Sequence, residues 1–206
     1  MKKIYARIFS LIILALLGYS HIYSDDKQNQ QVFKPKNVIG NNSAKNILEE
    51  YASLSCIHCA NFHKKQLPSI KKELINTGKL KYIYRDFPLD LPAMIASMVT
   101  HCYQGEQYFA VLDTLFRKQK TWVSASDNKE NFESTLATVL KQHGINKEKI
   151  KECTAENDKN KIKWNSILAS RLDGQNRGVN STPSFFLNGK KLEGTVDLNF
   201  LKENIK

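Results

Sequence analysis

Cys56 and Cys59 are separated by two residues, and this C-x-x-C spacing is suited to redox chemistry. A strand-compatible run at 47–52 precedes them, and apolar residues spaced as on one face of a helix follow them. A cysteine at the start of a helix meets unpaired backbone N–H groups and the positive end of the helix dipole, which favour its thiolate. That thiolate is the nucleophile of disulfide exchange, and a second cysteine one turn on can resolve the mixed disulfide.

Two histidines lie close to this pair in the sequence. His58, between the cysteines, can add positive charge or a hydrogen bond that lowers the thiol pKa, so we expect a redox-tuning role rather than a plain spacer. His63, one turn beyond Cys59, leaves a second interpretation open. Together with His58 and the two thiols it would form a soft site for zinc or copper(I).

The elements that must position the cysteines can be predicted from the surrounding pattern. We expect a strand at 47–52, a helix at 57–76 that is kinked by Pro68 and ended by Gly78, and a second strand at 80–85. A strand, a helix and a strand at this spacing form a βαβ unit with parallel strands. The C-x-x-C then lies at the junction between the first strand and the helix.

The middle of the chain has a different character, because helical periodicity dominates it from Leu91 to about Leu172. Its apolar stripes, the last of which holds Ile162, Ile167, Leu168 and Leu172, are typical of core-facing helices. Strand chemistry returns at 184–187, followed by an Asn188-Gly189 hairpin turn and a final helix at 197–205. The sequence therefore predicts an α/β fold with a helical sub-domain inserted at about 91–177.

The N-terminal segment reads as an export signal. Lys2, Lys3 and Arg7 precede an apolar run at 8–17, which is too short to span a bilayer comfortably, and small or polar residues follow it. We expect a signal peptide at 1–24, a polar leader at 25–37 and a folded domain at 38–206. Export favours disulfide chemistry over a cytosolic metal site for the four cysteines of the chain.

The formal net charge of +11 raises the question of nucleic-acid or membrane binding. Lysines are spread along the whole chain and interleaved with Glu, Asp and Asn instead of forming a block. We therefore expect an ordinary basic surface and no nucleic-acid partner.

Several motifs in order resemble the thioredoxin fold in its DsbA-like form. The resemblance spans about 38–206 and rests on these segments: Cys56-Ile57-His58-Cys59, Leu67-Pro68 in the kinked helix, Arg85-Asp86-Phe87-Pro88-Leu89 at a strand end, and Gly178-Val179-Asn180-Ser181-Thr182-Pro183-Ser184-Phe185. The last segment resembles the family pattern G-V-x-G-T-P-S-F. It departs from that pattern at Ser181, which adds bulk beside the substrate groove where many relatives have glycine.

The resemblance implies roles for particular residues. Cys56 takes the place of the exposed nucleophile, and Cys59 that of the resolving cysteine. Ser181-Thr182-Pro183 takes the place of the substrate-binding segment that faces the C-x-x-C with a cis proline, and an X–Pro bond is the ordinary site of a cis peptide. Glu50 has the spacing of the family's buried acid, whose raised pKa would let it accept the Cys59 proton, and strand alternation places Glu49 on the opposite face.

Cys102 and Cys153 both fall in the helical sub-domain and lack C-x-x-C spacing. They could form a second redox pair or a structural disulfide. Related DsbA-like proteins sometimes carry an extra bridge in this region, so the resemblance favours the structural disulfide.

These observations predict an exported protein disulfide oxidoreductase that oxidises reduced proteins in the periplasm through the Cys56-Cys59 centre. The resemblance implies no organic cofactor and a membrane partner for reoxidation. A disulfide isomerase or reductase of the same fold is the main alternative, and the absence of room for a dimerisation domain in the leader favours the oxidase. A zinc- or copper-binding protein and a non-enzymatic holdase are the alternatives from other classes.

Overall fold

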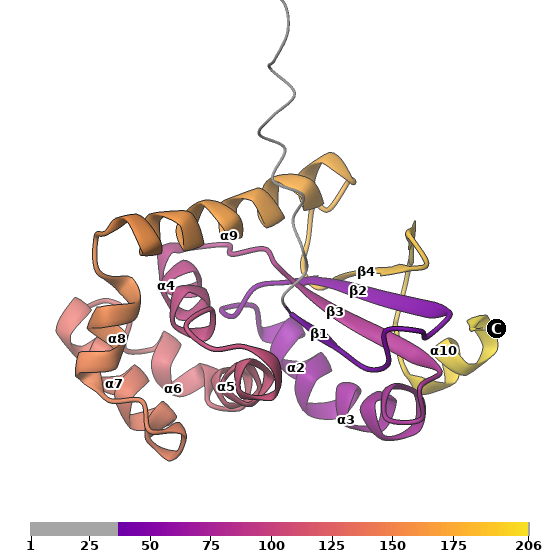
Figure 1. Cartoon of the computed structure of the whole chain (residues 1–206), viewed down its shortest axis with the longest axis horizontal. Coiled ribbons are helices and arrows are strands. Elements are labelled where there is room, and N and C mark those ends of the chain that lie inside the picture. The colour runs from indigo at the N-terminus through magenta and orange to yellow at the C-terminus, as the bar shows by residue number, and fades with distance from the viewer. Residues whose placement is uncertain (1–36, 206) are drawn as a thin grey trace, which may run out of the picture. The chain divides into compact units, whose positions relative to one another are not determined.

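The computed structural model describes residues 37–205, which contain a five-stranded sheet in the order β1-β3-β2-β4-β5 (Figure 1). β2 and β3 run parallel, and the other neighbours are antiparallel. The strands are β1 (Val38–Ile39), β2 (Asn46–Ala52), β3 (Leu80–Asp86), β4 (Ser184–Leu187) and β5 (Lys190–Lys191). The mixed sheet and its helices confirm the predicted α/β class. The predicted signal peptide and almost all of the predicted leader lie outside the described residues.

The helix expected at 57–76 is divided into three pieces. α2 (Ile57–Lys65) ends before the proline, α3 (Leu67–Ile70) holds Pro68 in its first turn, and a π-helical turn follows at Lys71–Ile75. Proline has no N–H to donate, and in a first turn that donor is not needed. The predicted kink is therefore a break, and a new helix starts around the proline.

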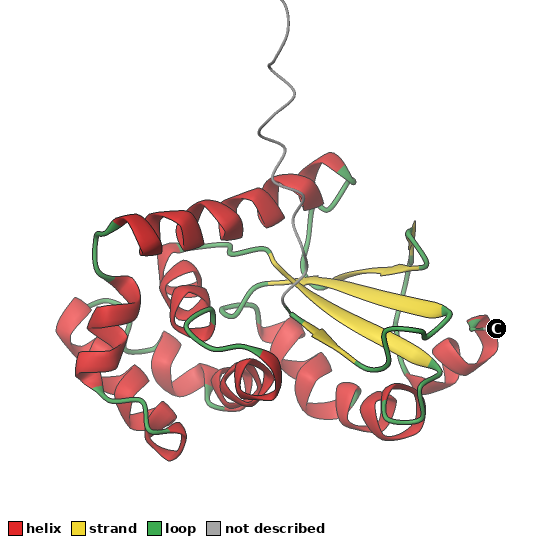
Figure 2. Cartoon of the chain, in the orientation of Figure 1, coloured by secondary structure: helices red, strands yellow, loops and turns green. Residues whose placement is uncertain are grey.

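In the sequence, a group of helices separates β3 from β4, and all helices of the described residues are red in Figure 2. It comprises α4 (Leu91–Thr100), α5 (Gly105–Arg117), α6 (Gln119–Val123), α7 (Lys129–Leu140) with a short 3₁₀ turn at Lys141–His143, α8 (Lys147–Thr154) and α9 (Asp158–Asn176). The expectation of an apolar core stripe on α9 is wrong for three of its four residues. Only Ile167 is buried, whereas Ile162, Leu168 and Leu172 are 65%, 41% and 56% exposed. One face of this long helix meets solvent with apolar side chains.

The two faces of the sheet carry different layers (Figure 1). The C-terminal end of α9 packs on the face that holds Tyr51, with Phe87 and Phe186 in the same apolar cluster. This approach requires glycine at position 174, because a Cβ there would lie 2.8 Å from the Tyr51 ring. The opposite face carries the main core and is covered by α2, α3 and α5.

A hairpin sets the register of β4 beside β2. Asn188 and Gly189 both have positive φ, 52° and 82°, as the predicted Asn-Gly turn requires. The side chain of Asn188 accepts a hydrogen bond from the Ile47 amide at 2.8 Å, and Ser184 is paired with Tyr51. The loop that precedes β4 therefore lies at the end of β2. The final helix, α10 (Leu198–Asn204), is capped by Asp197.

Candidate active site

Cys56 is the N-cap residue of α2. Its backbone is extended and its Sγ accepts a hydrogen bond from the Cys59 amide at 3.4 Å, a position that Ser, Thr, Asp or Asn usually occupies. No acidic residue lies in the first turn of α2, while three basic residues lie in its last turn. The sulfur thus occupies the positive end of the helix, where negative charge is stabilised.

The loop before β4 faces this sulfur. Cys56 Sγ lies 3.2 Å from the Thr182 carbonyl oxygen, to which the protonated thiol donates a hydrogen bond, and the Thr182–Pro183 peptide bond is cis. Ser181 is exposed beside it, and its carbonyl accepts a hydrogen bond from the Ser184 hydroxyl at 2.7 Å. The segment identified from the sequence therefore lies against Cys56 and offers backbone groups next to the nucleophile.

The two thiols have opposite pKa shifts. A hydrogen bond with the Cys59 thiol is the largest cause that lowers the pKa of Cys56 to about 5, against the opposing effect of burial, and the amides of Cys59 and His58 add to it. Burial, the hydrogen bond to Cys56 and the charge of Glu50 raise the pKa of Cys59 well above its ordinary value. His58 acts on Cys56 through its backbone amide, and its side chain is exposed. One dithiol thus holds a thiolate and a firmly protonated thiol.

The acid that the resemblance implies is buried, and its charge acts on Cys59. Glu50 is 0% exposed, its Oε2 lies 3.1 Å from Nε2 of His63, and the Tyr82 hydroxyl donates a hydrogen bond to the same oxygen. His63 is the candidate metal ligand of the sequence analysis, and here it pairs with a carboxylate. Within residues 37–205, no group of three or more His, Cys, Asp or Glu side chains is arranged to hold a metal ion.

Strand alternation separates Glu49 from Glu50. Glu49 lies on the α9 face, where it forms ion pairs with Arg85 at 2.6 Å and Arg177 at 2.9 Å. Burial alone would raise the pKa of Glu49, but hydrogen bonds from Arg177 and Arg85 outweigh it and hold the pKa below its ordinary value. This carboxylate ties the end of α9 to the sheet just before the loop that carries Thr182.

The sequence analysis missed Gln119, the first residue of α6. Its buried side-chain amide donates to the carbonyl oxygens of Leu54 at 2.7 Å and Cys56 at 2.8 Å, so the inserted helices hold the loop that presents the nucleophile. The sequence carries no local signal for this contact, because more than 60 residues separate the partners.

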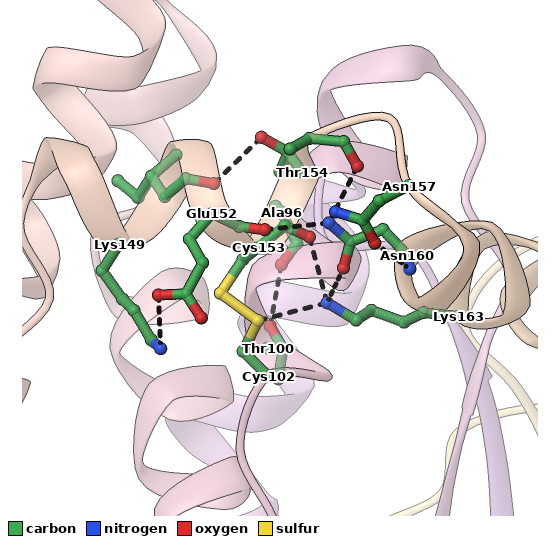
Figure 3. Close-up of a disulfide and its surroundings, with 12 residues drawn as sticks. Ala96, Thr100, Cys102, Lys149, Glu152, Cys153, Thr154, Asn157, Asn160 and Lys163 are labelled. Carbon is green, nitrogen blue, oxygen red and sulfur yellow. Dashed lines mark hydrogen bonds and ion pairs between the residues drawn. A yellow bond between two sulfur atoms is a disulfide. The ribbon is translucent and has the colours of Figure 1, made fainter.

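Cys102 and Cys153 form a disulfide with a Cα–Cα distance of 6.0 Å, which links the segment after α4 to α8 (Figure 3). The ammonium group of Lys163 donates to Cys102 Sγ at 3.1 Å, to the Cys153 carbonyl at 3.0 Å and to Asn160 Oδ1 at 3.0 Å. Burial lowers the pKa of Lys163 to about 8. These contacts place the bridge in the helical unit, where it joins secondary-structure elements.

Comparison with known proteins gives a consistent picture. The sequence model of the Thioredoxin family matches residues 33–206. A relative from Rickettsia typhi, named as a protein-disulfide oxidoreductase, is 30% identical over 158 residues, covering 76% of this chain and 56% of the relative. Disulfide bond formation protein D of Bacillus cereus is 24% identical over 199 residues, covering 88% of this chain and 86% of that protein. The chain spans a little over half the length of the Rickettsia relatives that it matches.

Solved structures agree with the fold assignment. The crystal structure of alpha-DsbA1 from Wolbachia pipientis is similar with a TM-score of 0.69 at 28% identity, covering 82% of this chain and 87% of that one. BdbD from Bacillus subtilis has a TM-score of 0.69 at 20% identity, covering 84% and 91%, which shows a shared fold. These similarities confirm the thioredoxin fold predicted from the sequence.

Proposed function

This chain belongs to the thioredoxin family, and from that premise we propose that it is an exported oxidoreductase that introduces disulfide bonds into other exported proteins. The observation that carries the proposal is the asymmetry of the dithiol. Cys56 has a pKa of about 5 beside a backbone carbonyl of the cis-proline loop, and Cys59 is buried with a raised pKa. A stabilised thiolate is a good leaving group in disulfide exchange, so it favours release of the oxidised product.

The proposed reaction begins with the Cys56–Cys59 disulfide. A substrate thiolate attacks Cys56 Sγ, a mixed disulfide forms, and the electron pair of the broken bond leaves on Cys59, which takes up a proton. A second substrate thiolate attacks the substrate sulfur of the mixed disulfide, and Cys56 leaves as a thiolate. The substrate is oxidised by two electrons and the dithiol is reduced. Glu50 is proposed to exchange the Cys59 proton, and Ser181-Thr182-Pro183 to bind substrate backbone.

The direction of the reaction follows from the same asymmetry. Stabilising the Cys56 thiolate stabilises the reduced dithiol relative to the disulfide, so the oxidised form becomes a stronger oxidant. We expect a reduction potential well above the value of about −270 mV that is typical of thioredoxin. An isomerase or reductase would need the opposite in vivo state, with the dithiol kept reduced.

The test is oxidation of a reduced, unfolded protein substrate by the pure oxidised protein, together with the potential measured in glutathione buffers. Cys56→Ser serves as the inactive control. Formation of native disulfides and a potential above that of thioredoxin would support the oxidase. A potential at or below that of thioredoxin, with no oxidation, would contradict it and favour a reductase. Correct rearrangement of a scrambled substrate by the reduced protein would favour an isomerase.

The cellular setting is part of the proposal. The segment at 1–24 would direct export to the periplasm, and a membrane redox partner would reoxidise the dithiol. Within residues 37–205, no helix is long and apolar enough to cross a membrane. Thiol trapping in periplasmic extracts would test both points, since an oxidase should be found there with Cys56 and Cys59 mostly oxidised.

A further inference from the structure

The buried pair of Glu50 and His63 has a geometry that a merely structural hydrogen bond does not require. The two side chains are 0% and 2% exposed, and Nε2 of His63 lies 3.1 Å from Oε2 of Glu50. The imidazole ring is stacked on Phe116 of α5, with ring centroids 4.0 Å apart and planes inclined by 27°. The Tyr82 hydroxyl donates a hydrogen bond to the same carboxylate oxygen, and its oxygen lies 3.5 Å from Nε2 of His63. The ring is therefore held in one orientation toward the carboxylate.

The neighbours of this pair come from three elements. α2 supplies Cys59, whose pKa responds to the charge of Glu50. β3 supplies Tyr82 and Tyr84, and α5 supplies Tyr108, all three with pKa values raised mainly by burial. These tyrosines stay neutral at physiological pH, so the proton balance of the site concerns the carboxylate, the imidazole and the thiol.

The two acids of β2 show what the pairing achieves. Glu49 is ion-paired with two guanidinium groups, which stay charged at every physiological pH. Glu50 is paired with an imidazole, whose two ring nitrogens can each carry a proton. The other carboxylate oxygen, Oε1, is buried and has no hydrogen-bond partner among the described residues, so the carboxylate retains an acceptor position. A carboxylate in this setting can receive a proton from a further group.

We propose that Glu50 and His63 hold one proton between them and exchange it with Cys59 as a single unit, in which His63 is a positioning residue that also shares the proton. This inference rests on the proposed function. When the Cys56–Cys59 bond breaks, the electron pair leaves on Cys59 Sγ and the shared proton moves to that sulfur. Cys59 becomes a neutral thiol, and the Glu50–His63 pair becomes singly negative.

The unit keeps the net buried charge constant. Before the transfer, the thiolate carries one negative charge and the protonated pair is neutral in sum. After it, the thiol is neutral and the pair carries that charge. A second uncompensated charge would carry a large desolvation penalty in a low-dielectric site. Glutamine at position 63 could still donate a hydrogen bond to Glu50, but it could not take the proton, so His63→Gln separates the two roles.

The experiment measures the reverse transfer, in which Cys59 must lose its proton. A mixed disulfide of Cys56 with glutathione is prepared, and the intramolecular attack by Cys59 is followed as glutathione release from pH 5 to 9. General acid–base groups typically contribute at least about 100-fold to a rate. We expect Glu50→Gln to slow release by roughly that factor and His63→Gln by at least about 10-fold, with an altered pH profile. The double variant should be no slower than Glu50→Gln, because groups that act as a unit are not additive.

A matched control is available in the same molecule. His101 lies 2.7 Å from Asp86, so His101→Gln removes another partly buried histidine–carboxylate contact. We expect this control to release glutathione at the wild-type rate. A wild-type rate and pH profile for His63→Gln, or fully multiplicative effects in the double variant, would overturn the proposal.

Two further measurements separate the possible failures. Alkylation of Cys56 against pH reports the nucleophile alone, and it should be unchanged in a folded His63→Gln variant. If wild-type Cys56 shows no depressed pKa and the mixed disulfide never resolves, the proposed function fails. If the variants do not fold, ¹⁵N NMR of the histidine rings in the wild-type protein replaces them. The His63 ring should shift between the oxidised and reduced protein, and identical titrations in both states would overturn the inference.

Discussion

The molecule contains two cysteine pairs that differ in their spacing in the sequence and in what surrounds them in the fold. Cys56 and Cys59 lie one turn apart at a helix N-terminus, beside a loop that offers backbone groups to a substrate. Cys102 and Cys153 are 51 residues apart in sequence and join two helical segments, and Cys153 is 1% exposed. The first pair spans almost no chain, whereas the second closes a long loop.

This difference shows that the position of a sulfur in the fold, and not the presence of a disulfide, determines its role. A bond that closes a four-residue turn constrains the unfolded chain little, so its formation and cleavage leave the fold intact. A bond that closes a long loop restricts the unfolded state strongly and contributes to stability. We therefore expect substitutions in the first pair to abolish activity, and substitutions in the second to have the larger effect on the stability of the oxidised protein.

The largest expected effect is loss of activity in Cys56→Ser. Serine retains the N-cap hydrogen bond but provides no sulfur for exchange, so oxidation of a reduced substrate should fall to the uncatalysed rate. The paired variant Cys102→Ser/Cys153→Ser should retain most of the activity. Turnover of a reduced substrate by both variants measures this difference. Activity of Cys56→Ser above the uncatalysed rate would contradict the role assigned to the first pair.

The second effect concerns stability. A 51-residue separation corresponds to about 4 kcal/mol on the chain-entropy model of a disulfide. Cys102→Ser/Cys153→Ser should therefore unfold at a clearly lower denaturant concentration than the wild-type protein, while Cys56→Ser/Cys59→Ser should change the midpoint much less. Guanidinium unfolding of the oxidised proteins makes the comparison. Equal midpoints for wild type and Cys102→Ser/Cys153→Ser would show that the bridge is not a stabilising element.

Local chemistry explains what could be predicted from the sequence. The thiol pair, the Thr182-Pro183 segment and Glu50 are each recognised from a short stretch of sequence, and the structure brings all of them to the end of β2. The contact of Gln119 with the Cys56 loop and the pairing of His63 with Glu50 depend on how distant elements pack, so spacing alone could not identify them. The hydrogen bond from Cys59 as the main cause of the Cys56 shift also required coordinates.

Periodicity was a poorer guide to packing than to helix formation. α9 was expected from its pattern, yet Ile162 and Leu172 are exposed, because Gly174 and Ile167 lie on the packed side of the helix. An apolar residue on a helix is buried in the core only when another layer of the fold packs on its side of the helix. Pro68, just after α2, shows the same limit, because either a kink or a restart of the helix accommodates a residue without an N–H donor.

The third effect is a pH dependence that only the first pair should show. The pKa of Cys56 is about 5 in the folded, reduced protein and about 8.5 for a free cysteine. A depressed pKa contributes stability that is fully present above about pH 8.5 and is lost as pH falls through about 5. At pH 7 this contribution is about 3 kcal/mol, the two-unit interval between pH 5 and pH 7.

Urea unfolding of the reduced protein from pH 4.5 to 8 measures this contribution, with Cys56→Ser as the reference that removes the titrating group. The stability difference between the two proteins should grow as pH rises above 5. The same titration of Cys102→Ser/Cys153→Ser should parallel that of the wild-type protein. A difference between wild type and Cys56→Ser that stays constant over this range would contradict the assignment of the thiolate.

The smallest expected effect tests the charge beside the second pair. The pKa of Lys163 is lowered by burial to about 8, so the unfolded chain, with a lysine pKa of about 10.4, binds more protons between these two values. Stability contributed by the wild-type side chain should therefore rise as pH increases from 8 to about 10.

At pH 7, Lys163→Met should change stability by no more than about 1 kcal/mol, because the lost hydrogen bonds are offset by removal of a buried charge. Above pH 9, the neutral amine retains two of its three N–H donors without that cost, and the wild-type protein should become the more stable of the two. Thermal unfolding of both oxidised proteins from pH 7 to 10 measures the difference. A constant difference would mean that the pKa of Lys163 is not lowered in the folded protein.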